Sequence, residues 1–212
     1  MTAIATLHDL MIHQLRDIYS AEKQLVSALP KVAKKAQAAE LQAAIRTHLA
    51  QTEQHVQRLE QVFQELGETP KGVTCKGMKG LIDESDELLG EDVDPGVLDA
   101  GIIADAQRIE HYEIAAYGTV CEYAKSMGHM KVASLLHDTL EEEKNTDKLL
   151  SSLAEGGINS LASRDGLETM GTRDRGAMRA EPRCDRVLVT RTAVGTGNRY
   201  LYHTLNLSAS LS

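Results

Sequence analysis

Three glutamates occupy positions where a helical hydrophobic pattern calls for an apolar side chain. With about 100° of rotation per residue, Glu22, Glu113 and Glu143 each lie at the centre of an apolar stripe, in three different segments. A carboxylate that is buried alone is costly, and several carboxylates that converge repel one another. A divalent cation relieves both penalties, and carboxylates combined with imidazole suit iron or manganese. The pattern therefore predicts a buried metal site between helices.

Other potential ligands flank these glutamates. Glu110 precedes Glu113 by one helical turn and lies about 60° to the side. On another stripe, His48 and His55 flank Thr52. His55 is compatible both with a metal ligand and with a hydrogen-bonded core histidine, whereas we interpret His48 as structural. The candidate metal ligands are Glu22, His55, Glu110, Glu113, Glu143 and Asp147, for two ions of iron or manganese.

Four long amphipathic helices position these residues, at about 6–35, 40–66, 97–127 and 131–153. Pro30 predicts a kink or a break near the end of the first helix. Gly67 and Gly128 predict the ends of the second and third helices, and Gly156 with Gly157 predicts the end of the fourth.

The two helical pairs are joined by a long connection, from Gly67 to Gly96, with a short amphipathic helix at 81–89. One long crossover is typical of the ferritin-like topology, so we predict an all-α, ferritin-like four-helix bundle over residues 1–158.

The sequence changes character after residue 158. Every lysine lies at or before Lys148, whereas eight of the twelve arginines lie at or after Arg164. Helical periodicity is lost, and Arg, Gly, Ser and Thr dominate. We predict that residues 159–212 form an irregular, disordered or weakly structured tail. A weak hairpin, a basic interaction tail and a shifted reading frame remain alternatives.

The composition excludes several classes of partner. The formal net charge is −8, which disfavours binding to duplex nucleic acid. No apolar run is long enough to span a bilayer, and the N-terminus lacks the pattern of a secretory signal. Three widely spaced cysteines indicate neither a disulfide framework nor a zinc site. We therefore expect a cytoplasmic protein that binds neither membranes nor nucleic acid.

Three segments carry a resemblance to a known family: DIYSAEKQL at 17–25, IEHYEIAAYGT at 109–119 and TLEEEKNTDKLL at 139–150. They resemble the YciE/YciF-type family of ferritin-like bacterial stress proteins, over residues 1–158. The resemblance implies a four-helix bundle with a rubrerythrin-like di-metal centre, and a homodimer.

The resemblance also assigns ligands residue by residue. Glu22 matches the glutamate of the first helix, Glu110 and Glu113 match a Glu-x-x-Glu, and Glu143 matches the glutamate of the fourth helix. Two positions depart from the di-iron pattern, which takes Glu-x-x-His from two helices. The sequence has Thr52 in place of a glutamate, and Thr146 in place of a histidine.

Two functions follow as hypotheses. The first is a di-metal oxidoreductase, resembling a peroxidase or catalase, that handles peroxide or oxygen under stress. The alternative is a non-enzymatic helical stress protein that acts by dimerisation, partner binding or metal sequestration, which the two threonines favour. A third interpretation is that the buried carboxylates form only a network that fixes the register of the helices.

Overall fold

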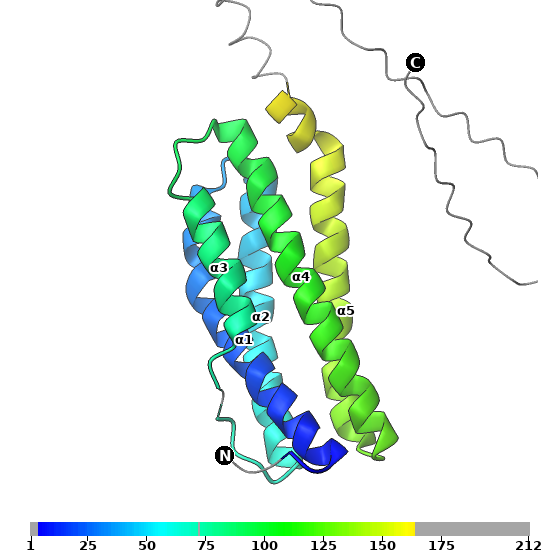
Figure 1. The fold of residues 1–212 in the computed structure, drawn as a ribbon. Coiled ribbons are helices and arrows are strands. Elements are labelled where there is room, and N and C mark those ends of the chain that lie inside the picture. The colour runs from blue at the N-terminus through cyan, green and yellow to red at the C-terminus, as the bar shows by residue number, and fades with distance from the viewer. Residues whose placement is uncertain (1–3, 72, 164–212) are drawn as a thin grey trace, which may run out of the picture. The chain divides into compact units, whose positions relative to one another are not determined.

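A computed structural model describes residues 4–71 and 73–163, and its four long helices form a bundle (Figure 1). They are α1 (Leu7–Lys35), α2 (Ala39–Glu65), α4 (Pro95–Ser126) and α5 (Met130–Leu153). The α1–α2 and α4–α5 pairs are antiparallel hairpins. Helix α1 also packs on α4, and α2 packs on α5, which closes the bundle. The predicted all-α fold is confirmed.

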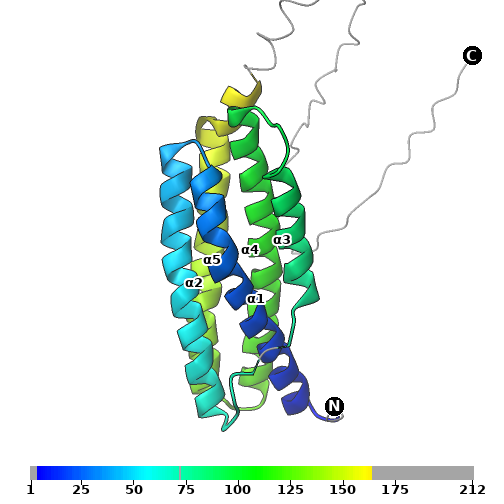
Figure 2. The ribbon, with the colours of Figure 1, turned by 90° about the vertical axis from the view of Figure 1, so that its left-hand side faces the viewer.

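The crossover runs the length of the bundle, because α2 ends and α4 begins at opposite ends (Figure 1 and Figure 2). It contains the short helix α3 (Lys76–Leu88), which packs on α4 and α1. The long connection of ferritin-like topology is therefore present, with the predicted helix inside it.

Local signals set most of the helix ends. At the start of α1, the backbone N–H of Asp9 donates to Thr6 Oγ1 at 3.1 Å, and the Thr6 N–H donates to Asp9 Oδ2 at 2.9 Å. This capping box satisfies two N–H groups that have no partner within the helix. At the ends of α2 and α4, Gly67 and Gly128 adopt φ of 69° and 77°, which glycine tolerates best.

Two predicted helix limits differ from the structure. Helix α1 runs through Pro30 without a break, because Leu29 and Ala33 on either side of it are buried in the core. Helix α3 begins at Lys76 rather than Leu81, because Cys75 Sγ accepts the N–H of Met78 at 3.4 Å.

The end of α5 at Leu153 agrees with the predicted range of 131–153. The chain continues from Leu153 through a π-helical turn, Ala154–Ile158, and helical residues extend to 163. Gly157 bends this segment with φ of 151°, and the burial of Ile158 against the bundle favours the continuation. The predicted tail lies outside the described residues from 164 onward.

The core consists of two apolar clusters separated by a polar layer. One cluster lies around Leu15, Phe63 and Val120, and the other around Leu25 and Ile102. The layer between them contains buried polar side chains from all four long helices: Glu22, His48, Thr52, His55, Glu110, Glu113 and Glu143. A polar layer of this kind inside an apolar core is expected to serve a function, because burying it costs free energy.

Asp99 of α4 caps the start of α2 from a different helix. The side chain is buried, Oδ1 accepts the N–H of Gln37 at 2.8 Å, and Oδ2 accepts the N–H of Ala38 at 2.7 Å. The capping residue of α2 itself, Ala38, has no side chain that can accept. Asp99 thus fixes the α1–α2 turn against α4.

Asp99→Ala is expected to lower the free energy of unfolding by about 2–3 kcal/mol, because two charge-assisted hydrogen bonds are lost and two N–H groups lose their partners. Urea unfolding followed by circular dichroism measures this. The matched control is Asp86→Ala, which breaks an exposed 2.6 Å ion pair with Lys31 and should cost less than about 1 kcal/mol. Equal losses in the two variants would contradict the capping role.

Candidate metal centre

The polar layer contains two groups of donor atoms that share one glutamate. In the first group, one donor atom from each of His48, Glu110, Glu113 and Glu143 lies within 4.8 Å of all the others. In the second, Glu22, His55 and Glu143 meet the same condition. The arrangement offers two adjacent positions for cations, with Glu143 placed to bridge them.

The donor atoms of these groups lack hydrogen-bond partners. Among the described residues, both oxygens of Glu113 and both of Glu143 are buried and unpaired, as are Glu22 Oε2 and Glu110 Oε2. Buried polar atoms normally have a partner, so unpaired atoms concentrated in one layer require an explanation.

The imidazoles are close to these carboxylates but poorly aligned for hydrogen bonds. His55 Nδ1 lies 3.0 Å from Glu143 Oε1 and 3.5 Å from Glu22 Oε1, and His48 Nε2 lies 3.2 Å from Glu110 Oε1. None of these contacts has the direction of a hydrogen bond, and both nitrogens count as unpaired. Donor atoms that converge without bonding one another fit a cation placed between them. The residues present therefore fit a pair of metal ions.

Burial and mutual repulsion dominate the electrostatics of the layer. Burial raises the pKa of Glu113 and Glu110 well above the usual value, and the nearby carboxylates, Glu143 among them, raise it further. Burial also raises the pKa of Glu22. Without a cation these glutamates therefore favour their protonated forms, and binding a metal must release protons.

The imidazoles respond to their neighbours in opposite directions. Burial works against a charged His55, but the nearby carboxylates of Glu143 and Glu22 outweigh it and raise the pKa of His55 to about 10. The pKa of Glu143 is lowered despite its burial, because His55 and His48 stabilise the carboxylate. Burial lowers the pKa of His48, which favours the neutral ring that a metal requires.

Glu142 and Arg58 hold the His55 ring from outside the layer. His55 Nε2 lies 2.8 Å from Glu142 Oε2. Arg58 donates to the same carboxylate through Nη1 at 2.9 Å and Nη2 at 3.3 Å. Arg58 Nη1 also donates to Thr139 Oγ1 at 2.6 Å. A carboxylate on one ring nitrogen orients the other toward a metal. Sequence analysis missed this role of Glu142, although His55 and Arg58 are spaced to share a helix face.

Arg58→Met is expected to weaken metal affinity by about 10–100-fold, because Glu142 and hence the His55 ring lose their anchor while the apolar stem is retained. Competition with a chromophoric chelator measures the affinity. The matched control is Arg46→Met, which makes the same change at an exposed position of the same helix. Unchanged affinity in Arg58→Met would show that the ring orientation does not depend on this anchor.

Five of the six predicted ligands come together, and Asp147 is the exception. Asp147 Oδ1 accepts from Gln107 Nε2 at 3.2 Å and lies 3.3 Å from the exposed His111, outside both groups. Tyr117 donates its hydroxyl hydrogen to Glu22 Oε1, whereas Tyr19 donates to Glu60 at 3.1 Å.

His48 is the residue whose place in the layer the sequence analysis missed. Its Nε2 faces Glu110, and its Nδ1 lies 3.4 Å from Thr146 Oγ1, so an imidazole from α2 stands beside the position where a histidine of α5 was expected. Thr52 is turned back on its own helix and donates to the His48 carbonyl at 2.8 Å. His48 and His55 are seven residues apart, so they lie two turns apart on one face of α2. This spacing is the sequence signal that could have placed both in the polar layer.

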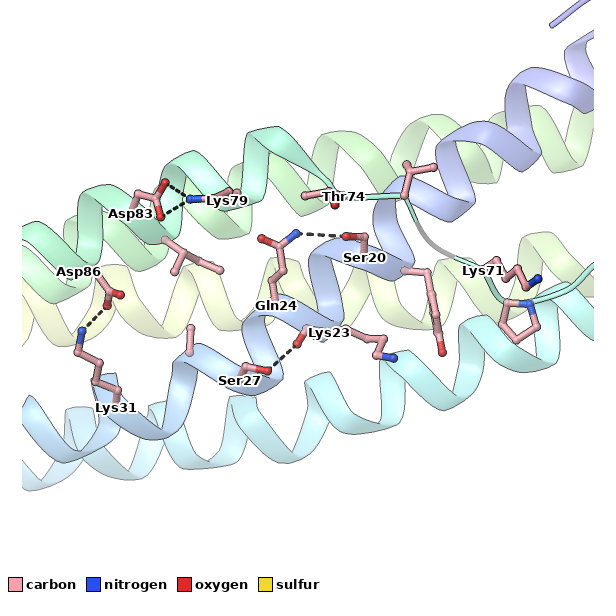
Figure 3. A pocket seen from close by; sticks show the side chains of 15 residues that line it. Ser20, Lys23, Gln24, Ser27, Lys31, Lys71, Thr74, Lys79, Asp83 and Asp86 are labelled. Carbon is pink, nitrogen blue, oxygen red and sulfur yellow. Dashed lines mark hydrogen bonds and ion pairs between the residues drawn. The ribbon is translucent and has the colours of Figure 1, made fainter. Parts of the chain in front are cut away.

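A large groove lies elsewhere, on the outside of the bundle. It has a volume of about 930 Å³ and is bordered by α1, α3 and the loop before α3 (Figure 3). Lys31 and Lys79 in its walls are paired with Asp86 and Asp83. None of the residues in the two donor groups lines this groove, so it is separate from the candidate centre.

A four-helix bundle with one long crossover and a mid-core layer of carboxylates and imidazoles defines a ferritin-like protein. The chain belongs to the family described as Domain of unknown function (DUF892), which it matches over residues 6–163. This agrees with the YciE/YciF-type resemblance of the sequence.

Individual relatives support this assignment. The chain is 44% identical to Protein YciF of Escherichia coli K12 over 158 residues, which are 74% of this chain and 95% of the relative. The crystal structure of the E. coli stress protein YciF matches with a TM-score of 0.71 and 43% identity, covering 74% of this chain and 99% of that one. YcfI from Rhodopseudomonas palustris matches with a TM-score of 0.69 and 46% identity, covering 70% and 95%.

A more distant structure, from Xanthomonas campestris pv. campestris, shares the fold, with a TM-score of 0.61 and 19% identity, covering 76% of this chain and 99% of that one. Separately, no helix in the described part of the chain is long and apolar enough to cross a membrane.

Proposed function

We propose that this chain is a stress-associated ferritin-like protein that holds two iron or manganese ions in its polar layer and handles peroxide or oxygen. The observation that carries the proposal is the set of buried, unpaired donor atoms that form two groups around Glu143. The similarity to a protein described as the E. coli stress protein YciF supports the stress association.

The two groups divide the ligands. Glu22, His55 and Glu143 would hold one ion, and His48, Glu110, Glu113 and Glu143 would hold the other. His48 would supply the second imidazole in place of the histidine that Thr146 replaces. If bound, the pair would supply two electrons, one from each ion, enough to reduce one dioxygen with two protons to hydrogen peroxide, or one hydrogen peroxide with two protons to two waters.

The surrounding residues prepare the site in three ways. The carboxyls of Glu110 and Glu113, whose pKa burial raises, hold protons until a cation displaces them. The Tyr117 hydroxyl fixes one oxygen of Glu22, which leaves Oε2 free to bind. The apolar clusters on either side of the layer limit the access of water, which strengthens the electrostatic interactions within it.

Metal analysis of the full chain tests the proposal. The protein is purified without chelator, reconstituted with Fe(II) or Mn(II), and analysed by ICP-MS, and the consumption of dioxygen and of peroxide is then followed with and without metal. We expect both ions to be retained and at least one of the two oxidants, dioxygen or peroxide, to be consumed only by the loaded protein. Failure to retain either metal would refute the proposal.

Thr52 favours a second candidate function. At the centre of the α2 stripe it bonds to a backbone carbonyl, so α2 contributes no carboxylate where the di-iron pattern has one. Metal retention without turnover of peroxide or oxygen would favour the non-enzymatic role in metal sequestration or partner binding. The predicted homodimer remains part of both proposals, and light scattering coupled to size exclusion measures it.

A further inference from the structure

A small cavity lies inside the bundle, in the half that contains Leu25 and Ile102. It has a volume of about 40 Å³, and residues of all five helices line it. At one end its lining includes His48, Glu110 and Thr146, so the cavity adjoins the candidate metal centre. It therefore extends the polar layer into the apolar half of the core.

The same cavity reaches toward the surface between α2 and α5. Its lining includes Ala44, which is half-buried, and Leu149, which is 45% exposed. Ala44 is short, and leucine can change rotamer on the nanosecond timescale at an exposed position, so these two side chains offer little obstruction to a small molecule. The cavity thus connects the α2–α5 seam with the two candidate ligands His48 and Glu110.

The walls of the cavity are apolar away from the centre. Ser85 is the one polar side chain in the lining besides the three at the inner end, and the other walls are Ala, Val, Leu and Ile. A molecule in this space finds few hydrogen-bond partners before it reaches His48 and Glu110. Hydrogen peroxide has two hydroxyl groups, and burying each without a partner costs about 1–3 kcal/mol. Dioxygen carries no such groups.

The size of the cavity restricts its occupant further. A single water requires about 10–15 Å³ of such space, so 40 Å³ accommodates a molecule of two or three heavy atoms and excludes ring-containing substrates. Anions are disfavoured as well, because the lining is mostly apolar and contains no lysine or arginine to pair with them.

We infer that this cavity is a binding site and an entry route for dioxygen, a small neutral molecule without hydrogen-bond donors, and that it discriminates against peroxide. The inference deepens the proposed function. It rests on that function only in so far as the dioxygen is delivered to the metal centre. The binding itself depends only on the apolar walls and the volume, so it is measurable in metal-free protein.

Dissolved dioxygen is paramagnetic, so it speeds the NMR relaxation of methyl groups that it contacts. In metal-free, methyl-labelled full-length protein under oxygen pressure, we expect several-fold stronger enhancement for the methyls of Ile45, Ile102 and Leu150 than for those of Leu59 and Val62. The first three line the cavity, whereas the last two are equally buried in the other cluster. Addition of hydrogen peroxide should leave the chemical shifts of the lining methyls unchanged.

Ala106→Leu is expected to reduce the enhancement at the lining methyls to the level of Leu59, because Ala106 lines the cavity and the larger side chain fills it. Ala116→Leu, the same change on the same helix beside the other cluster, should leave it unchanged. If Ala106→Leu does not fold, Ala106→Val adds a smaller side chain to the cavity and should reduce the enhancement in part.

Equal enhancement at both sets of methyls in the wild-type protein would overturn the inference, whatever the metal content. Shifts of the lining methyls with peroxide would overturn the discrimination. Protein that retains no metal but shows the expected enhancement would refute the proposed function and still support the cavity as a dioxygen site.

Discussion

Glu143→Ala is expected to remove both metal ions from the protein, whereas Glu22→Ala and Glu110→Ala should each leave about one ion per chain. The difference follows from the geometry, because Glu143 belongs to both donor groups while Glu22 and Glu110 each belong to one. A bridging carboxylate neutralises both cations at once, so its loss removes a ligand from each and exposes the ions to mutual repulsion. ICP-MS of the reconstituted full-length variants measures the outcome.

Glu53→Ala is the matched control, since it removes an exposed glutamate of α2 and should retain both ions. One ion retained by Glu143→Ala would show that the two groups bind independently. Two ions retained by Glu110→Ala would show that the ion assigned to His48, Glu110, Glu113 and Glu143 binds elsewhere. In either case the division of ligands proposed here would be wrong.

The three central glutamates were predictable because each is defined by the periodicity of its own helix. Glu22, Glu113 and Glu143 interrupt stripes whose direction depends only on residues three and four positions apart, and the structure buries all three. The topology was equally accessible, since it follows from the length of one connection. The pattern within single helices therefore predicts the centre of the site, and the length of the connection predicts the topology.

The residues that the structure places differently from the expectation lie at the flanks of their stripes. His48 and Asp147 both flank a stripe centre, and periodicity alone cannot rank them. Their environments depend on how neighbouring helices are shifted and rotated: His48 faces Glu110 of α4, whereas Asp147 is turned toward Gln107 and His111. The Arg58–Glu142 anchor was missed for the same reason, because it joins α2 to α5.

Packing also explains where local rules failed. Pro30 is a strong local signal for the end of a helix, yet α1 continues past it, because Leu29 and Ala33 bury apolar surface in the core. Tertiary burial of several side chains outweighs the loss of one backbone hydrogen bond.

Glu113→Leu is expected to abolish binding of the ion that Glu113 shares with His48, Glu110 and Glu143. At the same time it should stabilise the metal-free protein. Both carboxylate oxygens of Glu113 are buried without partners, and burial followed by repulsion from Glu22, Glu143 and Glu110 raises its pKa well above the usual value. Replacing an unsatisfied buried polar group by an apolar one of similar size relieves about 1–3 kcal/mol. For a protein of this length, each kcal/mol corresponds to about 2–4 °C in Tm.

Thermal unfolding at neutral pH, in the presence of a chelator, measures this gain. Glu122→Leu is the matched control: it makes the same change on the same helix, at an exposed glutamate paired with Lys125, and should leave Tm nearly unchanged. Metal should raise the Tm of the wild-type protein, because it binds only the folded state, and should raise that of Glu113→Leu less.

The sign of the change in Tm separates two explanations of the polar layer. If the carboxylates are kept only to fix the register of the helices, removal of Glu113 leaves its neighbours without a partner, and the metal-free variant should be less stable than the wild-type protein. If they are kept to bind metal, the metal-free wild-type protein is the one under strain, and the variant gains stability as it loses the ion. A lower Tm for Glu113→Leu, with metal content unchanged, would therefore favour a structural network over a metal centre.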